Sequence, residues 1–402
     1  MTVRITKPEF NLREKISELD KPTGIKGLDL MRSDTSQDAR DLISVGRKNL
    51  IINGAMLVAQ RGTSTTTLGY LIDRFLSGAA NINNPTYAQV DVASGTQPYA
   101  AGFRKAAKYT GADNAVHSND VLKFNQKIEA QHIATSGWDY RSGSSFITLS
   151  FWVKSSVSTT FFGRLQSYDG TNQNYVFSYD VVANTWTKVV KTIPGNANIT
   201  INNDTGVGLD IEWTLYRGID TTSSDTVVNL WQTYSSSKRL PDGVPSTWHD
   251  TNAATWEITG IQLEVGRNAT EFEHRSFGEE LALCQRYFYM HANGSVDGNG
   301  SGGSAISDNA SAYNSDLVFF TVDFPVTMRS KPALAASNGS GHYGYYTPGG
   351  NLTGFDTLSL DGVTTRTVGN INFSVSSAFS GGQSILVRTK TSDATLAFNA
   401  EL

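Results

Sequence analysis

Apolar and polar side chains alternate with a period of two residues in several segments after residue 49, which is the period of a half-buried β-strand. Between residues 146 and 154, one face carries Ile147, Leu149, Phe151 and Val153, and the opposite face carries Trp152. The same alternation recurs in residues 175–179, 209–217, 261–265, 371–375 and 384–388, and residues 319–324 are aromatic and β-branched. Clusters of Gly, Asn, Asp and Ser separate these stretches. The pattern predicts a mainly β protein, with an antiparallel β-sandwich followed by a smaller C-terminal β-sandwich.

The first 48 residues differ, because their apolar side chains recur at helical spacing. Leu12, Ile16 and Leu19 lie at positions i, i+4 and i+7, and Leu42 and Ile43 lie on one side of a second short stretch. This pattern predicts a short helical arm. Two short amphipathic helices cannot bury their apolar stripes alone, so we expect these side chains to dock on another protein or on copies of themselves. A solvated arm without a partner is the alternative.

A further helical pattern interrupts the strands near residue 280. Ser276 and Glu279 have the spacing of a capping box, and Leu281, Cys284 and Phe288 share one face at i, i+3 and i+7. We therefore expect a linker helix, in which Cys284 is a small buried apolar side chain rather than a nucleophile. The expected segments are the helical arm (1–48), the main sandwich (49–278), the linker helix (279–292) and the C-terminal β domain (293–402).

The composition narrows the class of protein. The net charge is −4 and charged residues make up 17% of the chain, which argues against a basic face that binds nucleic acid. No run of about 18 apolar residues occurs, so we expect no membrane insertion. The N-terminus lacks the apolar core of a signal peptide, so a protein that works outside cells would need another exit, such as release by lysis.

Motifs that carry chemistry are scarce. The six histidines and the single cysteine have no metal-binding spacing, and the Gly-rich run at 298–303 lacks the strand and helix of a dinucleotide site. We therefore expect no cofactor and no catalytic residue. A structural calcium ion is the alternative, with Asp91, Asp113 and Asp120 as candidate oxygen ligands.

Tryptophan is concentrated between residues 138 and 256, where all 7 copies fall. Flat aromatic faces with planar polar side chains nearby recognise sugars. Trp138, Trp231 and Trp248 lie in polar, turn-rich stretches, and Trp152 lies on the non-aliphatic face of its strand. Packing of a loop onto the sandwich is the competing interpretation. With tyrosine neighbours and a Tyr-rich stretch near the C-terminus, the candidate sugar-contacting residues are Trp138, Tyr140, Trp152, Trp231, Tyr234, Trp248, Tyr343 and Tyr345.

Nine short segments of the sequence carry a family resemblance. They are residues 49–54, 59–61, 150–155, 184–186, 256–264, 269–275, 280–287, 324–329 and 400–402. In these runs the chain resembles bacteriophage virion proteins with a jelly-roll domain like that of carbohydrate-binding modules, most often tail fibres. The resemblance covers most of residues 49–290 and parts of 317–402. It implies a jelly roll, a place in the virion outside the host cell, attachment to tail or adaptor proteins through the arm, and a homotrimer.

Three functions remain open at this point. The first is a non-enzymatic tail fibre that binds host surface glycans, through either the jelly roll or the C-terminal domain. The second is a structural virion protein, such as a head decoration, without glycan affinity. The third is a polysaccharide depolymerase, which needs two acidic residues in one cleft. We expect the first.

Overall fold

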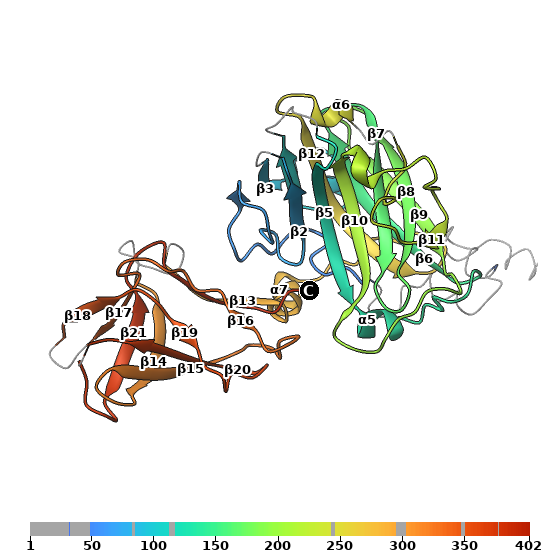
Figure 1. Ribbon diagram of the computed structural model, residues 1–402. Coiled ribbons are helices and arrows are strands. Elements are labelled where there is room, and N and C mark those ends of the chain that lie inside the picture. Colours follow the sequence, from blue (N-terminus) through green and yellow to red (C-terminus); the bar gives the residue numbers. More distant parts are fainter. Residues whose placement is uncertain are drawn as a thin grey trace, which may run out of the picture.

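The computed structural model describes most of the chain after residue 48. The described residues are 32, 49–82, 85–111, 117–242, 246–294, 303–346, 350–376 and 378–402. Apart from Arg32, the expected helical arm lies outside them, and so do the attachment residues Leu12, Ile16, Leu19, Leu42 and Ile43. The described chain forms two β-sandwiches (Figure 1). The larger one ends with β12 (Thr255–Val265), and the smaller one begins with β13 (Phe288–Asn293).

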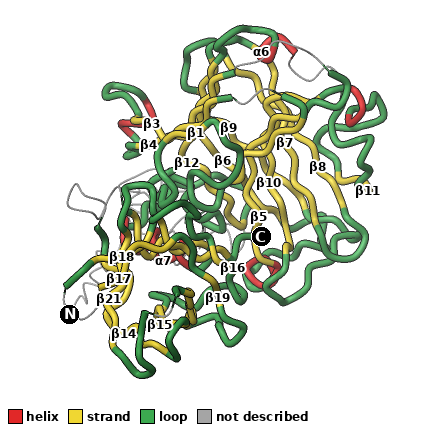
Figure 2. The backbone as a smooth tube through the Cα atoms, turned by 60° about the vertical axis from the view of Figure 1, so that its left-hand side comes forward, coloured by secondary structure: helices red, strands yellow, loops and turns green. Residues whose placement is uncertain are grey.

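Two six-stranded antiparallel sheets form the larger sandwich. Sheet A contains, in spatial order, β1 (Ser64–Thr65), β3 (Thr86–Asp91), β4 (Lys105–Thr110), β12, β6 (Phe146–Ser155) and β9 (Thr187–Pro194). Sheet B contains β11 (Trp231–Thr233), β8 (Gln173–Val181), β7 (Thr159–Ser167), β10 (Val207–Arg217), β5 (Val121–Glu129) and β2 (Leu76–Ala80). Figure 2 shows β8, β7, β10 and β5 side by side in one layer. The predicted antiparallel sandwich is confirmed.

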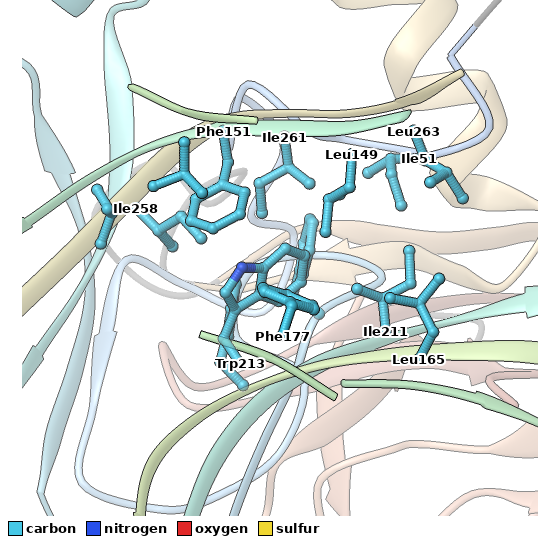
Figure 3. Close-up of a cluster of buried hydrophobic side chains, with 14 of the residues drawn as sticks. Ile51, Leu149, Phe151, Leu165, Phe177, Ile211, Trp213, Ile258, Ile261 and Leu263 are labelled. Carbon is cyan, nitrogen blue, oxygen red and sulfur yellow. The ribbon is translucent and has the colours of Figure 1, made fainter. Parts of the chain in front are cut away.

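Side chains that point inward from both sheets form the main core. Ile147, Leu149, Phe151 and Val153 are completely buried, as the alternation in β6 predicted. The ring of Phe151 meets the indole of Trp213 from sheet B edge-on, at 5.6 Å between centroids. Figure 3 shows the two layers of this core, with Leu149, Phe151, Ile258, Ile261 and Leu263 facing Leu165, Phe177, Ile211 and Trp213. Because alternate residues of each strand point the other way, the outer faces of both sheets carry the polar side chains.

The smaller sandwich has its own core and two antiparallel sheets. Its three-stranded sheet contains β13, β22 (Thr395–Asn399) and β16 (Ala333–Leu334). Its seven-stranded sheet contains β18 (Leu352–Phe355), β17 (Tyr343–Tyr346), β21 (Ser384–Thr389), β14 (Ala305–Ala312), β15 (Leu317–Asp323), β20 (Val368–Ser374) and β19 (Ser359–Leu360). The alternating stretches near residues 320, 371 and 386 therefore form strands, as predicted.

Helices are short in the described chain. They are α4 (Gln97–Ala100), α5 (Ala130–Ala134), the 3₁₀ helix η1 (Ile219–Thr221), α6 (Ser246–His249) and α7 (Phe277–Gln285). Over the residues that the structure describes, none of them has the length and apolar character needed to cross a membrane.

The expected linker helix over residues 279–292 is only partly correct. α7 begins at the predicted capping box, in which the hydroxyl of Ser276 accepts a hydrogen bond from the backbone N–H of Glu279. The helix ends at Gln285, and the following residues form β13, which pairs with β22 at the end of the chain. This pairing partner lies more than a hundred residues away, so the local apolar spacing could not reveal it. Cys284 is completely buried, as expected, and burial raises the pKa of its thiol well above the usual value.

The two sandwiches contact each other around α7 (Figure 1). Glu129, at the end of β5, accepts hydrogen bonds from Nε and Nη2 of Arg286, each at 2.8 Å, and one from the hydroxyl of Tyr287. Arg74 forms an ion pair with Glu401. These contacts tie the smaller sandwich to the strands of sheet B.

Candidate functional site

A segment after β12 lies over the outer face of sheet A, and we call residues 269–275 the strap. Two buried side chains on the outward face of β12 hold it in place. The side-chain carbonyl of Gln262 accepts the backbone N–H of Glu273 at 2.8 Å. The carboxylate of Glu264 accepts the backbone N–H of Thr270 at 2.9 Å and its hydroxyl at 2.6 Å. Gln262 and Glu264, which belong to the run 256–264 of the family resemblance, therefore anchor the strap to the sheet.

The other end of the strap is tied to the start of the sandwich. The backbone N–H of Asn49 donates to Glu273 at 2.6 Å, and Arg275 donates to the carbonyl oxygen of Asn49 at 2.7 Å. Arg275 also lies 3.3 Å from the carboxylate of Glu280 in α7. Because hydrogen bonds anchor both of its ends, the strap has a fixed position along the outer face of sheet A.

A glycine in a β-bulge lets the turn after α4 pack against the strap. The pairing of β12 with β6 shifts register between Thr259 and Gln262, and Gly260 lies there with φ +64°. A Cβ atom at this position would lie 2.5 Å from the ring of Phe103, which follows α4. The absence of a side chain therefore lets the ring of Phe103 approach the backbone of β12, and Phe272 of the strap meets this ring edge-on, at 4.8 Å between centroids.

Beside the strap and this turn, the outer face of sheet A forms a groove of about 500 Å³. The half-buried ring of Trp152 lines it, together with the side chain of Lys188, which pairs directly opposite Trp152 on β9. The other lining residues come from the turn after α4, from β6 and β12, and from the strap: Ala100, Ala101, Gly102, Phe103, Ser150, Gly260, Thr270, Glu271, Phe272 and His274.

The chemistry of the groove suits a ligand with apolar and polar faces. Trp152, Phe103 and Phe272 supply aromatic surface, and Lys188 and Glu271 supply opposite charges. Aromatic rings with a few polar groups around them are the usual composition of a sugar-binding site. Within the described ranges, no group of three or more His, Cys, Asp or Glu side chains is arranged to hold a metal ion.

Five of the eight candidate sugar-contacting residues are buried in the cores, so the expectation that they face a ligand was wrong. They are Trp138 (3% exposed), Trp231, Trp248, Tyr343 and Tyr345. Trp231, Tyr343 and Tyr345 lie in strands of the two sandwiches, and Trp248 lies in α6. The indole N–H of Trp231 donates to Pro194 at 2.7 Å, and that of Trp248 donates to Thr255 at 3.0 Å. A polar loop sequence therefore did not mean an exposed ring.

Tyr140 and Tyr234 are half-buried, but neither lines the groove. Tyr140 packs against the main core, and the ring of Tyr234 lies over the guanidinium groups of Arg164 and Arg239 on the sheet B side. Of the eight candidates, only Trp152 lines the groove. Phe103, Lys188 and the strap residues are not predicted from the sequence, although the strap coincides with one of the runs that carry the family resemblance.

The calcium candidates do not come together. Asp91 forms an exposed ion pair with Lys105 at 2.6 Å. Asp120 is buried and accepts the backbone N–H of His117 at 2.8 Å. Asp113 lies outside the described residues. Asp91 and Asp120 therefore each have a protein partner and do not share a site.

Gly260→Ala is expected to lower the free energy of unfolding by about 1–3 kcal/mol, because it strains a left-handed backbone position and displaces the ring of Phe103. Urea denaturation measures the loss. The matched control is Gly278→Ala in α7, where an added methyl group meets no atom within 4 Å and stability is expected to stay equal or rise. Equal stability of the two variants would contradict the role given to Gly260.

Comparison with known proteins found no matching family model and no matching curated protein. Among solved structures, the chain is similar to the enzymatically active domain of tailspike protein 4 from bacteriophage CBA120, at 11% identity and a TM-score of 0.29. That likeness covers 54% of this chain and 21% of the other, so the chain spans about a fifth of the length of the tailspike structure.

Two carbohydrate-binding modules are also similar. One is a CBM4 structure, with 13% identity and a TM-score of 0.27 over 53% of this chain and 98% of that one. The other is a family 11 module from Clostridium thermocellum in complex with a β-1,3-1,4-mixed-linked tetrasaccharide, with 11% identity and a TM-score of 0.24 over 50% of this chain and 91% of that one. Each likeness covers about half of the chain.

Proposed function

We propose that the protein binds carbohydrate on a host cell surface through the groove over sheet A and does not cleave it. The observation that carries the proposal is the half-buried ring of Trp152 inside a groove of about 500 Å³. One face of a pyranose ring is rich in C–H groups and packs on such an indole, while its hydroxyl groups bond to side chains at the rim.

The lining of the groove favours binding over hydrolysis. Among the described residues that line it, Glu271 supplies the single carboxylate. Glycoside hydrolysis ordinarily uses a pair of carboxyl groups about 5–9.5 Å apart on either side of the scissile bond. A groove with one carboxylate is therefore better suited to holding a glycan than to cutting it.

The proposal includes a setting for this binding. Since the chain resembles phage tail fibres, we place it in a homotrimeric fibre that attaches to the tail through residues 1–48. Three linked grooves raise the avidity of weak sugar sites without any new contact. A structural virion protein with no glycan affinity is the competing function.

Trp152→Ala is expected to weaken binding to immobilised bacterial lipopolysaccharide and capsular polysaccharide by about tenfold or more, because the stacking surface is removed. Trp152→Phe keeps a flat ring and is expected to retain part of the affinity. Tyr313→Ala, which removes a ring that is 74% exposed on the smaller sandwich, is the control and is expected to bind like the wild type. Surface plasmon resonance measures the affinities, and circular dichroism confirms that each variant is folded.

Chromatography of the bound polysaccharide completes this experiment. Intact polysaccharide is expected after incubation with the wild-type protein. Release of shorter saccharides would support a depolymerase instead. A wild-type protein that binds none of the preparations would support the structural virion protein, and full affinity in Trp152→Ala would exclude the groove as the binding site.

A further inference from the structure

Among the described residues, the groove holds one lysine that has no carboxylate partner. Lys188 is exposed, lines the groove and lies directly opposite Trp152 in the pairing of β6 with β9. Across the part of the chain that the structure describes, no carboxylate forms an ion pair with its ammonium group. The nearby Lys154 is different, because its ammonium lies 3.0 Å from the carboxylate of Glu257 and 5.1 Å from the ring of Trp186.

The two charged side chains that line the groove lie on different sides of it. Lys188 comes from β9, whereas Glu271 comes from the strap, which is anchored to β12. In sheet A, β6 with Trp152 lies between β9 and β12. A ligand stacked on Trp152 therefore meets a positive group on one flank and a negative group on the other.

His274 ties the strap to the turn after α4. Its Nε2 atom lies 2.9 Å from the carbonyl oxygen of Ala101, and a carbonyl oxygen can only accept a hydrogen bond. The negative charge of Glu271 on the strap repels another carboxylate, so the strap side disfavours the acidic group of a sugar.

We infer that the groove takes a glycan with a carboxylated sugar unit, such as a uronic acid, whose ring stacks on Trp152 and whose carboxylate pairs with Lys188. Side chains directly opposite each other on antiparallel strands have Cβ atoms about 4.5–5.5 Å apart, which is close to the width of one pyranose ring. One sugar unit can therefore satisfy both groups at once. The inference rests on the proposed function and specifies the class of sugar that the same site binds.

An array of acidic bacterial oligosaccharides, each printed beside its carboxyl-reduced derivative, tests the inference. The wild-type protein is expected to prefer the acidic member by about tenfold at low ionic strength, and added salt is expected to reduce the preference. Lys188→Gln is expected to weaken binding of the acidic members much more than binding of the reduced members, so that the preference disappears. Lys188→Arg keeps the charge and is expected to keep the preference. The control is Lys238→Gln, which changes a lysine that pairs with Asp225 and does not line the groove.

The outcomes separate this inference from the proposed function. If the wild type binds acidic and reduced members equally, or if Lys188→Gln loses both equally, the acidic-sugar inference is overturned while glycan binding stands. If the wild type binds no member of the array, or if Trp152→Ala binds as well as the wild type, the proposed function fails and the inference fails with it.

Discussion

Glu212→Gln is expected to destabilise the larger sandwich by about 3–5 kcal/mol. Glu212 lies on the outer face of β10 and is completely buried. Its carboxylate accepts hydrogen bonds from Arg164 at 2.8 Å and Arg217 at 2.7 Å, and Lys123 lies 3.8 Å away. The neutral amide would leave two buried guanidinium groups without the carboxylate to which they are hydrogen-bonded, which costs more than the lost hydrogen bonds alone.

The stabilising effect of Glu212 is expected to decrease as the pH falls. Burial alone would raise the pKa of Glu212, but Arg164, Arg217 and Lys123 outweigh it and hold the pKa well below the usual 4.5. A carboxylate with a lowered pKa in the folded state contributes its full stability above the unfolded pKa, and this contribution is lost as the pH falls. The difference in stability between wild type and Glu212→Gln is therefore expected to be largest near pH 7 and to shrink below about pH 4.5.

Urea denaturation at pH 7 and at pH 3.5 measures this difference. The control is Asp225→Asn, which removes the exposed ion pair between Lys238 and Asp225, and we expect no measurable change. A Glu212→Gln protein as stable as the wild type at pH 7 would show that the buried network contributes nothing to folding.

Glu129→Gln is expected to weaken the contact between the two sandwiches by about 2–3 kcal/mol. Glu129 is completely buried, and its two carboxylate oxygens take a bidentate pair of hydrogen bonds from Arg286, at 2.8 Å each. Tyr287 donates a further hydrogen bond to the same carboxylate. An amide can accept on one side only, so the variant loses both the charge and one arm of the pair.

Differential scanning calorimetry shows whether the two sandwiches unfold together or separately. We expect the wild-type sandwiches to unfold together, and we expect the Glu129→Gln variant to show the smaller sandwich unfolding first in a separate transition. Asp91→Asn, which removes an exposed ion pair with Lys105, is the control and is expected to leave the profile unchanged. A single unshifted transition in Glu129→Gln would contradict this role.

Of the residues that line the groove, the sequence predicted Trp152. Trp152 is predicted from its position in a strand whose apolar side chains recur at every second residue. That period determines the side of the sheet on which a side chain lies. The polar side chains and turn residues around them predicted that Trp138, Trp231 and Trp248 contact a sugar. Polar neighbours do not show whether a ring is exposed, and all three rings are buried, with Trp231 in β11 and Trp248 in α6.

The alternating pattern by itself determined that the chain is mainly β, and it located β6, β8, β10 and β12 and the side chains by which they enter the core, because side-chain direction in a strand follows from local geometry. The tertiary structure alone decided that residues 288–293 pair with β22 instead of extending α7. It also decided the groove, which joins Phe103, Trp152, Lys188 and the strap. These segments are far apart in sequence, and they meet because of the order in which the strands pair, which no local pattern of apolar and polar residues encodes.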